Sequence, residues 1–188
     1  MPLQHACFIS YRHPQIENEA MRAQAEKIVT TFKDSLDYQL QWYTNMRSWL
    51  DVRSLKGGQK FDAVLAENFC KSVCMISLYW PTYFDPTHTY CAREYRGMEL
   101  LEQKRKQLLP VNEHKDGLII PVIIKGADYF PQYVKDTTQY HDFSGLKPWD
   151  PPLYRHRKYA DKFDELARYI AMLCARFSAF KADLDPCI

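Results

Sequence analysis

The sequence predicts an α/β fold in which a central, mostly parallel five-stranded sheet is covered by helices on both faces. Short apolar runs alternate along the chain with longer segments whose apolar residues recur every three or four positions. This is the pattern of strands followed by one-faced helices. The run over residues 118–124 is apolar throughout, as expected of a strand buried on both faces of a parallel sheet. With 188 residues, the chain is long enough for one well-packed domain and short for two.

Five apolar runs are expected to be strands because they are short and rich in β-branched, aromatic or cysteine residues. The expected strands cover residues 6–11, 49–52, 73–78, 118–124 and 140–143. The second of these, with four residues, carries the weakest signal. Pro121 lies inside the fourth and cannot donate a hydrogen bond to a neighbouring strand, which predicts a sheet edge or a bulge near that point.

Four segments are expected to be helices because their apolar residues line one face at helical spacing. The expected helices cover residues 19–37, 61–69, 91–107 and 154–180. Gly57 and Gly58 break the chain before the second helix and permit positive φ angles. We therefore expect one domain over residues 1–180, followed by a polar tail over residues 181–188.

Composition argues against several classes of protein. The net charge of +2 is too small to indicate a nucleic-acid or membrane partner. The chain start has no signal-peptide pattern, and the longest apolar run is far shorter than the roughly 20 residues that span a bilayer. Cys7, Cys74 and Cys174 lie in apolar segments, so we expect reduced cysteines in a cytoplasmic protein. No zinc-ligand spacing of cysteine and histidine occurs, so no metal site is expected.

Four blocks, in order, resemble the signature segments of the toll/interleukin-1 receptor (TIR) domain. F-I-S-Y at residues 8–11 is similar to the first strand, and residues 49–61 resemble the second strand and the BB loop. Residues 70–79 resemble the third strand, and Y-C-A-R-E at residues 90–94 is similar to the family's W-C-x-x-E. The resemblance covers residues 5–177 and implies the flavodoxin-like TIR fold.

In enzymatic TIR domains, a glutamate at this helix start supports cleavage of NAD, so the resemblance implies that Glu94 is the catalytic residue. A helix N-terminus also favours an ionised carboxylate; the alternative is an ordinary first-turn glutamate that only stabilises its helix. Tyr90 stands where the family usually has tryptophan. Because residues four apart share a helix face, Tyr90 is expected to present a ring beside Glu94 and to stack on the substrate.

Three residues end the first expected strand, at the edge where open α/β sheets bind ligands. They are Ser10, Tyr11 and Arg12, and all three are expected to bind substrate. Arg12 can pair with a pyrophosphate through two parallel hydrogen bonds; alternatively, it is a surface arginine.

Three further residues are candidates for substrate binding. Asp51 contacts a ribose or fixes the loop after it, and Arg53 belongs to the segment that resembles the BB loop. Tyr79 ends the third strand and either walls the cleft or packs in the core. No G-x-G-x-x-G or P-loop spacing occurs, so NAD is expected to be a substrate and no cofactor is expected.

The resemblance leaves three functions open. The first is an NAD nucleosidase or cyclase that releases nicotinamide with ADP-ribose or a cyclic ADP-ribose as product. Such a protein is similar to the signal-producing component of Thoeris-like antiphage defence, where a separate effector protein senses the product. The second is a non-enzymatic adaptor acting through homotypic TIR contacts, for which Arg53, Leu55 and Gly57 would matter. The third is a domain of a larger defence protein. Self-association is expected from the resemblance alone.

Overall fold

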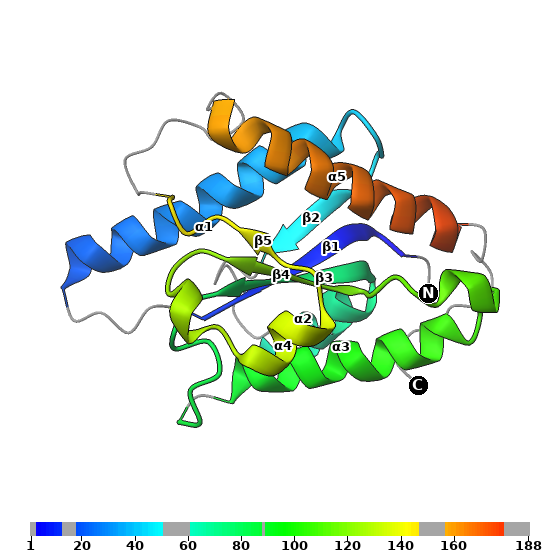
Figure 1. The fold of residues 1–188 in the computed structure, drawn as a ribbon, viewed down its shortest axis with the longest axis horizontal. Helices are drawn as coiled ribbons and strands as arrows, with labels where there is room; N and C mark the ends of the chain where they lie inside the picture. Colours follow the sequence, from blue (N-terminus) through cyan, green and yellow to red (C-terminus); the bar gives the residue numbers. More distant parts are fainter. Residues whose placement is uncertain (1–2, 13–17, 51–60, 88, 147–156, 179–188) are drawn as a thin grey trace.

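The computed structural model describes residues 3–12, 18–50, 61–87, 89–146 and 157–178. Within these residues, a five-stranded sheet runs in the order β2-β1-β3-β4-β5, and every neighbouring pair is parallel (Figure 1). The strands are β1 His5–Tyr11, β2 Arg47–Leu50, β3 Ser72–Tyr79, β4 Ile119–Ile123 and β5 His141–Asp142. The predicted parallel sheet is confirmed. Of the predicted second strand, residues 51 and 52 lie outside the described part of the chain.

Helices cover both faces of the sheet, as predicted. The helices α1 and α5 lie on one face, and α2, α3 and α4 lie on the other (Figure 1). Their bounds are α1 Glu19–Leu40, α2 Phe61–Cys70, α3 Tyr90–Lys106, α4 Gln132–Thr137 and α5 Arg157–Ser178. Two short 3₁₀ turns, η1 Val111–Glu113 and η2 Ala127–Tyr129, complete the elements. The sequence did not predict α4, η1 or η2, because one or two turns are too short to establish a periodic pattern.

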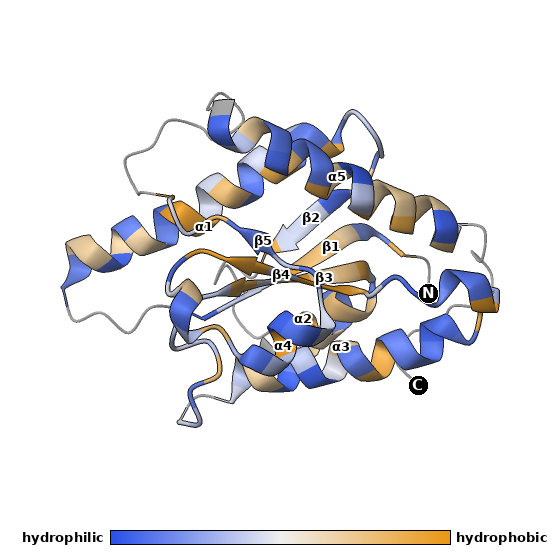
Figure 2. Cartoon of the chain, in the orientation of Figure 1, coloured by the Kyte–Doolittle hydropathy of each residue, from blue (hydrophilic) through white to orange (hydrophobic). Residues whose placement is uncertain are grey.

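The core lies between the sheet and its helical layers. All eight residues of β3 are buried, and the strands are largely apolar in Figure 2 while the helices are two-sided. On the α1 and α5 side, the ring of Phe32 contacts Phe143 and Phe163, with ring centroids 5.5 and 5.1 Å apart. The side chain of Asn18 accepts a hydrogen bond from the backbone N–H of Met21 at 3.1 Å and so caps α1.

Pro121 lies in β4 beside the shortest strand of the sheet. The carbonyl of Leu118 and the N–H of Ile124 both bond to β3. Because bonding direction alternates along a strand, Pro121 faces the β5 side, where pairing begins only at Val122 and continues at Ile123. Its missing N–H therefore faces an edge that β5 does not reach. The edge predicted near Pro121 is confirmed at this one position.

Arg105, near the end of α3, is buried with only 1% of its surface exposed. Its guanidinium donates to the carbonyl oxygens of Ser72 and Val73 at 2.7 Å and of Cys70 at 2.9 Å. Burial lowers its pKa to about 10, so the group remains charged at neutral pH. Arg105 thus ties the end of α3 to the end of α2 and the start of β3.

The described cysteines differ in their bonding state. Cys7, Cys74, Cys91 and Cys174 are free and buried. The expectation of reduced cysteines is therefore confirmed for Cys7, Cys74 and Cys174, whereas Cys70 is disulfide-bonded, which the sequence did not indicate. Disulfide formation depends on which sulfur lies within reach in space, and spacing along the chain does not reveal this. No described helix is long and apolar enough to span a membrane.

Candidate functional site

The end of β1, the loop after β3 and the start of α3 meet at the carboxyl edge of the sheet. Ser10, near the end of β1, donates a hydrogen bond from Oγ to Oε2 of Glu94 at 2.5 Å. The same Oγ lies 2.6 Å from the hydroxyl oxygen of Tyr83. Ser10 and Tyr83 are buried, whereas Glu94 is partly exposed. The structure therefore brings two predicted site residues, Ser10 and Glu94, into direct contact.

Glu94 lies one residue further into α3 than the sequence indicated, which places it beyond the first turn. The helix begins at Tyr90 rather than at residue 91, so Glu94 is its fifth residue and the first turn contains no acidic residue. The influence of a helix dipole falls off within the first turn. The expected first-turn stabilisation of Glu94 is therefore wrong, and its carboxylate instead accepts a hydrogen bond from Ser10.

Glu94 and Tyr90 line a pocket of about 190 Å³ between α2 and α3. This confirms that the two residues share a helix face. The Tyr90 ring is 53% exposed, and the Cζ atom of Arg93 lies 5.8 Å from its centroid. The α2 helix adds an apolar wall made of Leu65, Ala66 and Phe69. The pocket therefore presents a carboxylate, a guanidinium and an exposed aromatic ring beside an apolar surface.

Arg12 is buried and tied to the loop after β3. Its Nη1 donates to the carbonyl oxygen of Thr82 at 2.5 Å and lies 3.1 Å from Oδ2 of Asp85. Hydrogen bonds from the hydroxyl and N–H of Thr87, followed by the contacts with Arg12, lower the pKa of Asp85 to about 2. With 8% of its surface exposed, Arg12 is not a surface arginine. Its pairing with a pyrophosphate remains a prediction.

Two groups beside Glu94 stay uncharged at neutral pH. Burial raises the pKa of the Tyr83 phenol well above its usual value, and the nearby Cys91 and Glu94 raise it further. Burial, followed by the charge of Glu94, raises the pKa of the Cys91 thiol to about 12. Since a thiol attacks only as its thiolate, Cys91 is an apolar neighbour of the site and not a nucleophile.

The other predicted site residues lie apart from the pocket or outside the described chain. The hydroxyl of Tyr79 donates to the carbonyl of Tyr129 at 2.6 Å, and its buried ring belongs to a core cluster. This placement favours the core alternative for Tyr79. Tyr11 is partly buried against the main core. Asp51 and Arg53 lie outside the described residues, so their contacts with substrate remain predictions.

Tyr83 is the site residue that the sequence did not indicate. It lies in the loop between β3 and α3, where its N–H donates to the carbonyl of Trp80 at 2.9 Å and closes a turn. Loop residues carry no hydrophobic period, so pattern analysis does not assign them to a surface or a core. The available signal was the aromatic content of Y-W-P-T-Y-F at residues 79–84, which is high for an exposed loop.

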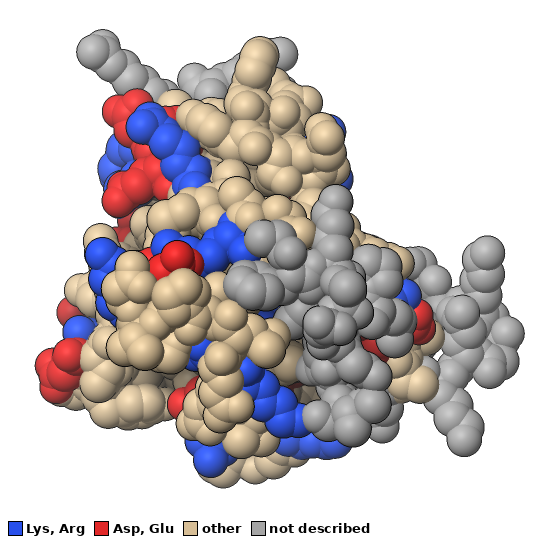
Figure 3. Space-filling model, turned by 90° about the vertical axis from the view of Figure 1, so that its right-hand side faces the viewer, with Lys and Arg blue, Asp and Glu red and all other residues tan. Residues whose placement is uncertain are grey.

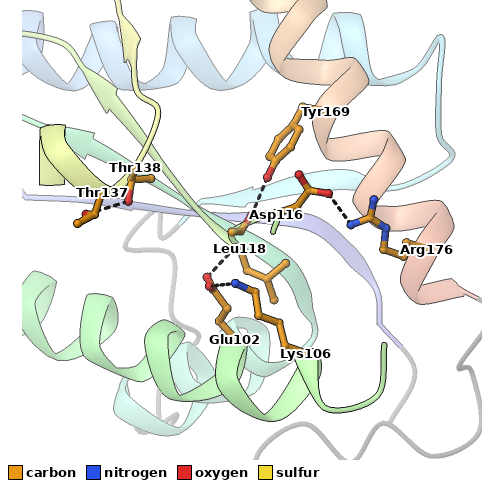
Figure 4. Close-up of polar contacts among 9 residues, drawn as sticks. Glu102, Lys106, Asp116, Leu118, Thr137, Thr138, Tyr169 and Arg176 are labelled. Carbon is orange, nitrogen blue, oxygen red and sulfur yellow. Dashed lines mark hydrogen bonds and ion pairs between the residues drawn. The ribbon is translucent and has the colours of Figure 1, made fainter. Parts of the chain in front are cut away.

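A larger groove of about 770 Å³ lies between α3, α4 and α5, beside the start of β4 and β5. No predicted site residue lines it. Several of its polar groups bind one another, as Figure 4 shows. Glu102 accepts hydrogen bonds from the N–H of Leu118 at 2.7 Å and from Lys106 at 2.6 Å. The hydroxyl of Tyr169 donates to the carbonyl of Gly117 at 2.9 Å. These pairs join α3 and α5 to the segment entering β4 and indicate a structural role.

Neither a metal-binding group in the described part of the chain nor a cluster of like charges on the face in Figure 3 marks a second site. Among the described residues, no group of three or more His, Cys, Asp and Glu side chains is placed to hold a metal ion. On the face drawn in Figure 3, basic and acidic side chains are interspersed. The pocket beside Glu94 therefore remains the candidate functional site.

No protein-family model and no curated protein matches the chain. Among solved structures, it is similar to the TIR domain of the Toll-related receptor TRR-2 from Hydra magnipapillata. The match covers 89% of this chain and 98% of that chain, with a TM-score of 0.52 and 15% sequence identity. This chain has the TIR fold.

A second similar structure is that of the TIR domains of the activated Roq1 resistosome, which directly recognises the pathogen effector XopQ. It covers 88% of this chain and 82% of that chain at 14% identity, but its TM-score of 0.36 gives it no weight. At these identities, the TIR assignment concerns the fold alone. What this TIR fold does must be argued from the chemistry of its site.

Proposed function

We propose that this TIR-fold protein cleaves the bond between nicotinamide and ribose in NAD, with Glu94 as the catalytic residue. One observation carries the proposal: a carboxylate lines a pocket at the carboxyl edge of the sheet and is held there by a buried hydroxyl. Open α/β sheets bind their ligands at this edge. A partly buried carboxylate beside a cleft is also a common form of catalytic group.

The reaction suits a single carboxylate. When the bond between the ribose C1′ and the pyridinium nitrogen breaks, the electron pair leaves with the nitrogen, and nicotinamide departs as a neutral molecule. No general acid is needed, because the leaving group starts as a cation. The ribose becomes oxocarbenium-like, as in glycoside hydrolysis, and the Glu94 carboxylate stabilises this developing positive charge.

Two fates of the ribose cation fit this scheme. Attack by water forms a bond to C1′, releases a proton and yields ADP-ribose. Attack by a nitrogen or hydroxyl of the same ADP-ribose moiety yields a cyclic product. The second outcome would supply a signal for a separate effector in antiphage defence.

The small size of the pocket supports a proposal for the part of NAD that enters it. Pockets that bury a whole drug-sized ligand measure roughly 300–1,000 Å³, whereas this one measures about 190 Å³. We therefore place the nicotinamide riboside end beside Glu94, with the exposed Tyr90 ring available for stacking. The adenosine and pyrophosphate would extend out of the pocket, and we propose Arg12, Asp51 and Arg53 as the residues that bind them.

A second function is favoured by the structural comparison. The TRR-2 domain belongs to a Toll-related receptor, and a TIR fold that works as an adaptor would act through contacts with other TIR domains. In that case Arg53, Leu55 and Gly57 would matter, and Glu94 would not. We also propose self-association for the enzyme, because a neighbouring copy can complete a small pocket.

One assay separates the two functions. Purified protein is incubated with NAD over a range of protein concentrations, and nicotinamide, ADP-ribose and cyclic products are followed by liquid chromatography and mass spectrometry. Nicotinamide release is expected from the wild type and is expected to fall about 10²- to 10³-fold in Glu94→Gln, on the scale of losing one transition-state contact. The matched control is Glu99→Gln on the same helix, where the carboxylate pairs with exposed Arg96. Absence of release at every concentration, or equal rates for wild type and Glu94→Gln, would favour the adaptor.

A further inference from the structure

Tyr83 has a fully buried side chain, and the proposed reaction assigns it no role. Its exposed fraction is 0%, yet it lies in a loop and not in a strand or helix. Its hydroxyl oxygen lies 2.6 Å from Oγ of Ser10. A buried hydroxyl that contacts the partner of a candidate catalytic group calls for a functional explanation.

The direction of the hydrogen bonds follows from counting protons. The Ser10 hydroxyl has one proton, and it is donated to Oε2 of Glu94 at 2.5 Å. Ser10 can therefore only accept from Tyr83, so the phenol must be the donor of the other bond. The resulting chain runs from Tyr83 to Ser10 to Glu94, with each hydroxyl donating toward the carboxylate. Each donor in such a chain polarises the next one.

The loop that carries Tyr83 is fixed from several sides. The Tyr83 ring packs edge-on against Phe84 with ring centroids 4.8 Å apart. The adjacent carbonyl of Thr82 accepts the short hydrogen bond from Arg12, which also pairs with Asp85. These contacts hold the phenol in one place, which a hydrogen-bond donor needs if it is to orient another group.

We propose that Tyr83 is a positioning residue that orients the Glu94 carboxylate through Ser10. The proposal rests on the function proposed above and assigns Ser10 a different role from the one its sequence position predicted. Both sides of its hydroxyl are engaged within the protein, so Ser10 acts on Glu94 and not on the substrate. Neither Tyr83 nor Ser10 touches the reacting atoms.

This role makes a specific kinetic prediction. Without the Tyr83 hydroxyl, Ser10 loses one of the groups that fix its hydroxyl, so Ser10 and the Glu94 carboxylate sample more orientations. The fraction of bound substrate that faces a correctly placed Glu94 then falls. We expect Tyr83→Phe to lower kcat about tenfold and to leave KM within about twofold, because orientation of a catalytic group is lost and substrate contacts are kept. Ser10→Ala should lower kcat about 30-fold, since it removes the direct contact.

The matched control is Tyr169→Phe. Tyr169 also donates its hydroxyl to an internal acceptor, the carbonyl of Gly117 at 2.9 Å, and burial raises its pKa to about 12. It lies on α5, away from Glu94, so Tyr169→Phe should leave kcat unchanged. The double variant Ser10→Ala with Tyr83→Phe should be no slower than Ser10→Ala alone, because the two residues act in series. Equal kcat for Tyr83→Phe and Tyr169→Phe, or multiplied effects in the double variant, would overturn the proposal.

A nuclear magnetic resonance measurement tests the hydrogen-bond chain without relying on activity. In protein carrying ¹³Cζ-labelled tyrosine, the hydroxyl proton of Tyr83 should exchange slowly with water. Ser10→Ala should accelerate that exchange and leave the Tyr169 hydroxyl unchanged. The β-proton couplings of Glu94 should indicate one rotamer in the wild type and averaged rotamers in Tyr83→Phe.

The activity assay and the magnetic resonance measurement distinguish a failure of the proposed function from a failure of the positioning role. A wild type that never releases nicotinamide disproves the proposed function, while the exchange rates and the Glu94 couplings still decide whether Tyr83 orients the carboxylate. A single Glu94 rotamer in both proteins would disprove the positioning role even in an active enzyme. If Tyr83→Phe does not fold, the β-proton couplings of Glu94 are measured in Ser10→Ala instead. These couplings then decide whether the hydrogen-bond chain orients the carboxylate.

Discussion

The two ends of α3 each carry a charged side chain that contacts the sheet, and they use it differently. At the C-terminal end, Arg105 is completely buried and donates to three backbone carbonyls. Near the N-terminal end, Glu94 is partly exposed, accepts from the side chain of Ser10 and lines a pocket. One charge is enclosed by backbone, and the other faces a space that a ligand can enter.

This contrast distinguishes a charged side chain with a structural role from one with a functional role. A buried charge is tolerated when several fixed partners compensate its lost hydration, and the carbonyls around Arg105 do this without leaving room for a ligand. A carboxylate that keeps an open side can interact with a charge that forms during a reaction. We therefore expect changes at Arg105 to alter stability and changes at Glu94 to alter activity.

The largest effect is expected at Glu94. Glu94→Gln should lower the rate of nicotinamide release about 10²- to 10³-fold, with a free energy of unfolding within about 1 kcal/mol of the wild type because the amide oxygen can still accept from Ser10. Paired measurements of NAD cleavage and urea unfolding check both halves. A large loss of stability would mean that this end of α3 is structural as well.

The next effect is expected at Arg105. Arg105→Met should lower the free energy of unfolding by about 3 kcal/mol, because three buried carbonyls lose a charged donor. Activity per folded molecule should remain unchanged. Urea unfolding measures the loss, and Arg96→Met, at an exposed position of the same helix, is the control expected to change little. A loss below about 1 kcal/mol would show that water replaces the guanidinium at little cost.

A smaller effect is expected at the pocket mouth. Tyr90→Ala should raise KM for NAD about fivefold, equivalent to about 1 kcal/mol of lost stacking. The kcat value should change little, and Tyr90→Trp should bind at least as tightly as the wild type. Steady-state kinetics with both variants decide this. An unchanged KM in Tyr90→Ala would place the nicotinamide ring elsewhere.

The smallest effect concerns acid stability beside the site. Asp85 has a folded-state pKa of about 2, below its ordinary value, so its contribution to stability is present above the unfolded-state pKa and is lost as the pH falls through about 2. Wild type should therefore lose stability between pH 4 and pH 2 more steeply than Asp85→Asn. Unfolding free energies across this range provide the test, with exposed Asp128→Asn as control. Parallel curves for wild type and Asp85→Asn would contradict the role of Arg12 and Thr87.

Much of the fold could be predicted because it depends on repeating patterns. The strands and long helices present their apolar residues with a fixed period, and the alternation of strands with helices predicts a parallel sheet. The start of α3 was misplaced by one residue, which was enough to assign Glu94 to the wrong turn. The sequence did not indicate the disulfide of Cys70, because spacing along the chain does not report distance in space.

The candidate site was predictable only in part. Glu94, Tyr90 and Ser10 follow strand or helix signals, so their meeting at one edge could be anticipated. Tyr83 depends on how a loop without periodicity folds back onto β1. The sequence left open whether Arg12 is a surface arginine, because its partners come from that same loop. Loop residues are placed by contacts that only the assembled fold provides.

The position of Pro121 has a consequence for solubility. A sheet with an exposed edge strand can pair with a strand of another molecule and grow into fibrous aggregates. At the β5 edge of this sheet, the outermost strand is two residues long, and its neighbour β4 has no amide proton at Pro121. A foreign segment approaching this edge would find an interrupted hydrogen-bond ladder, which disfavours amyloid-like stacking there.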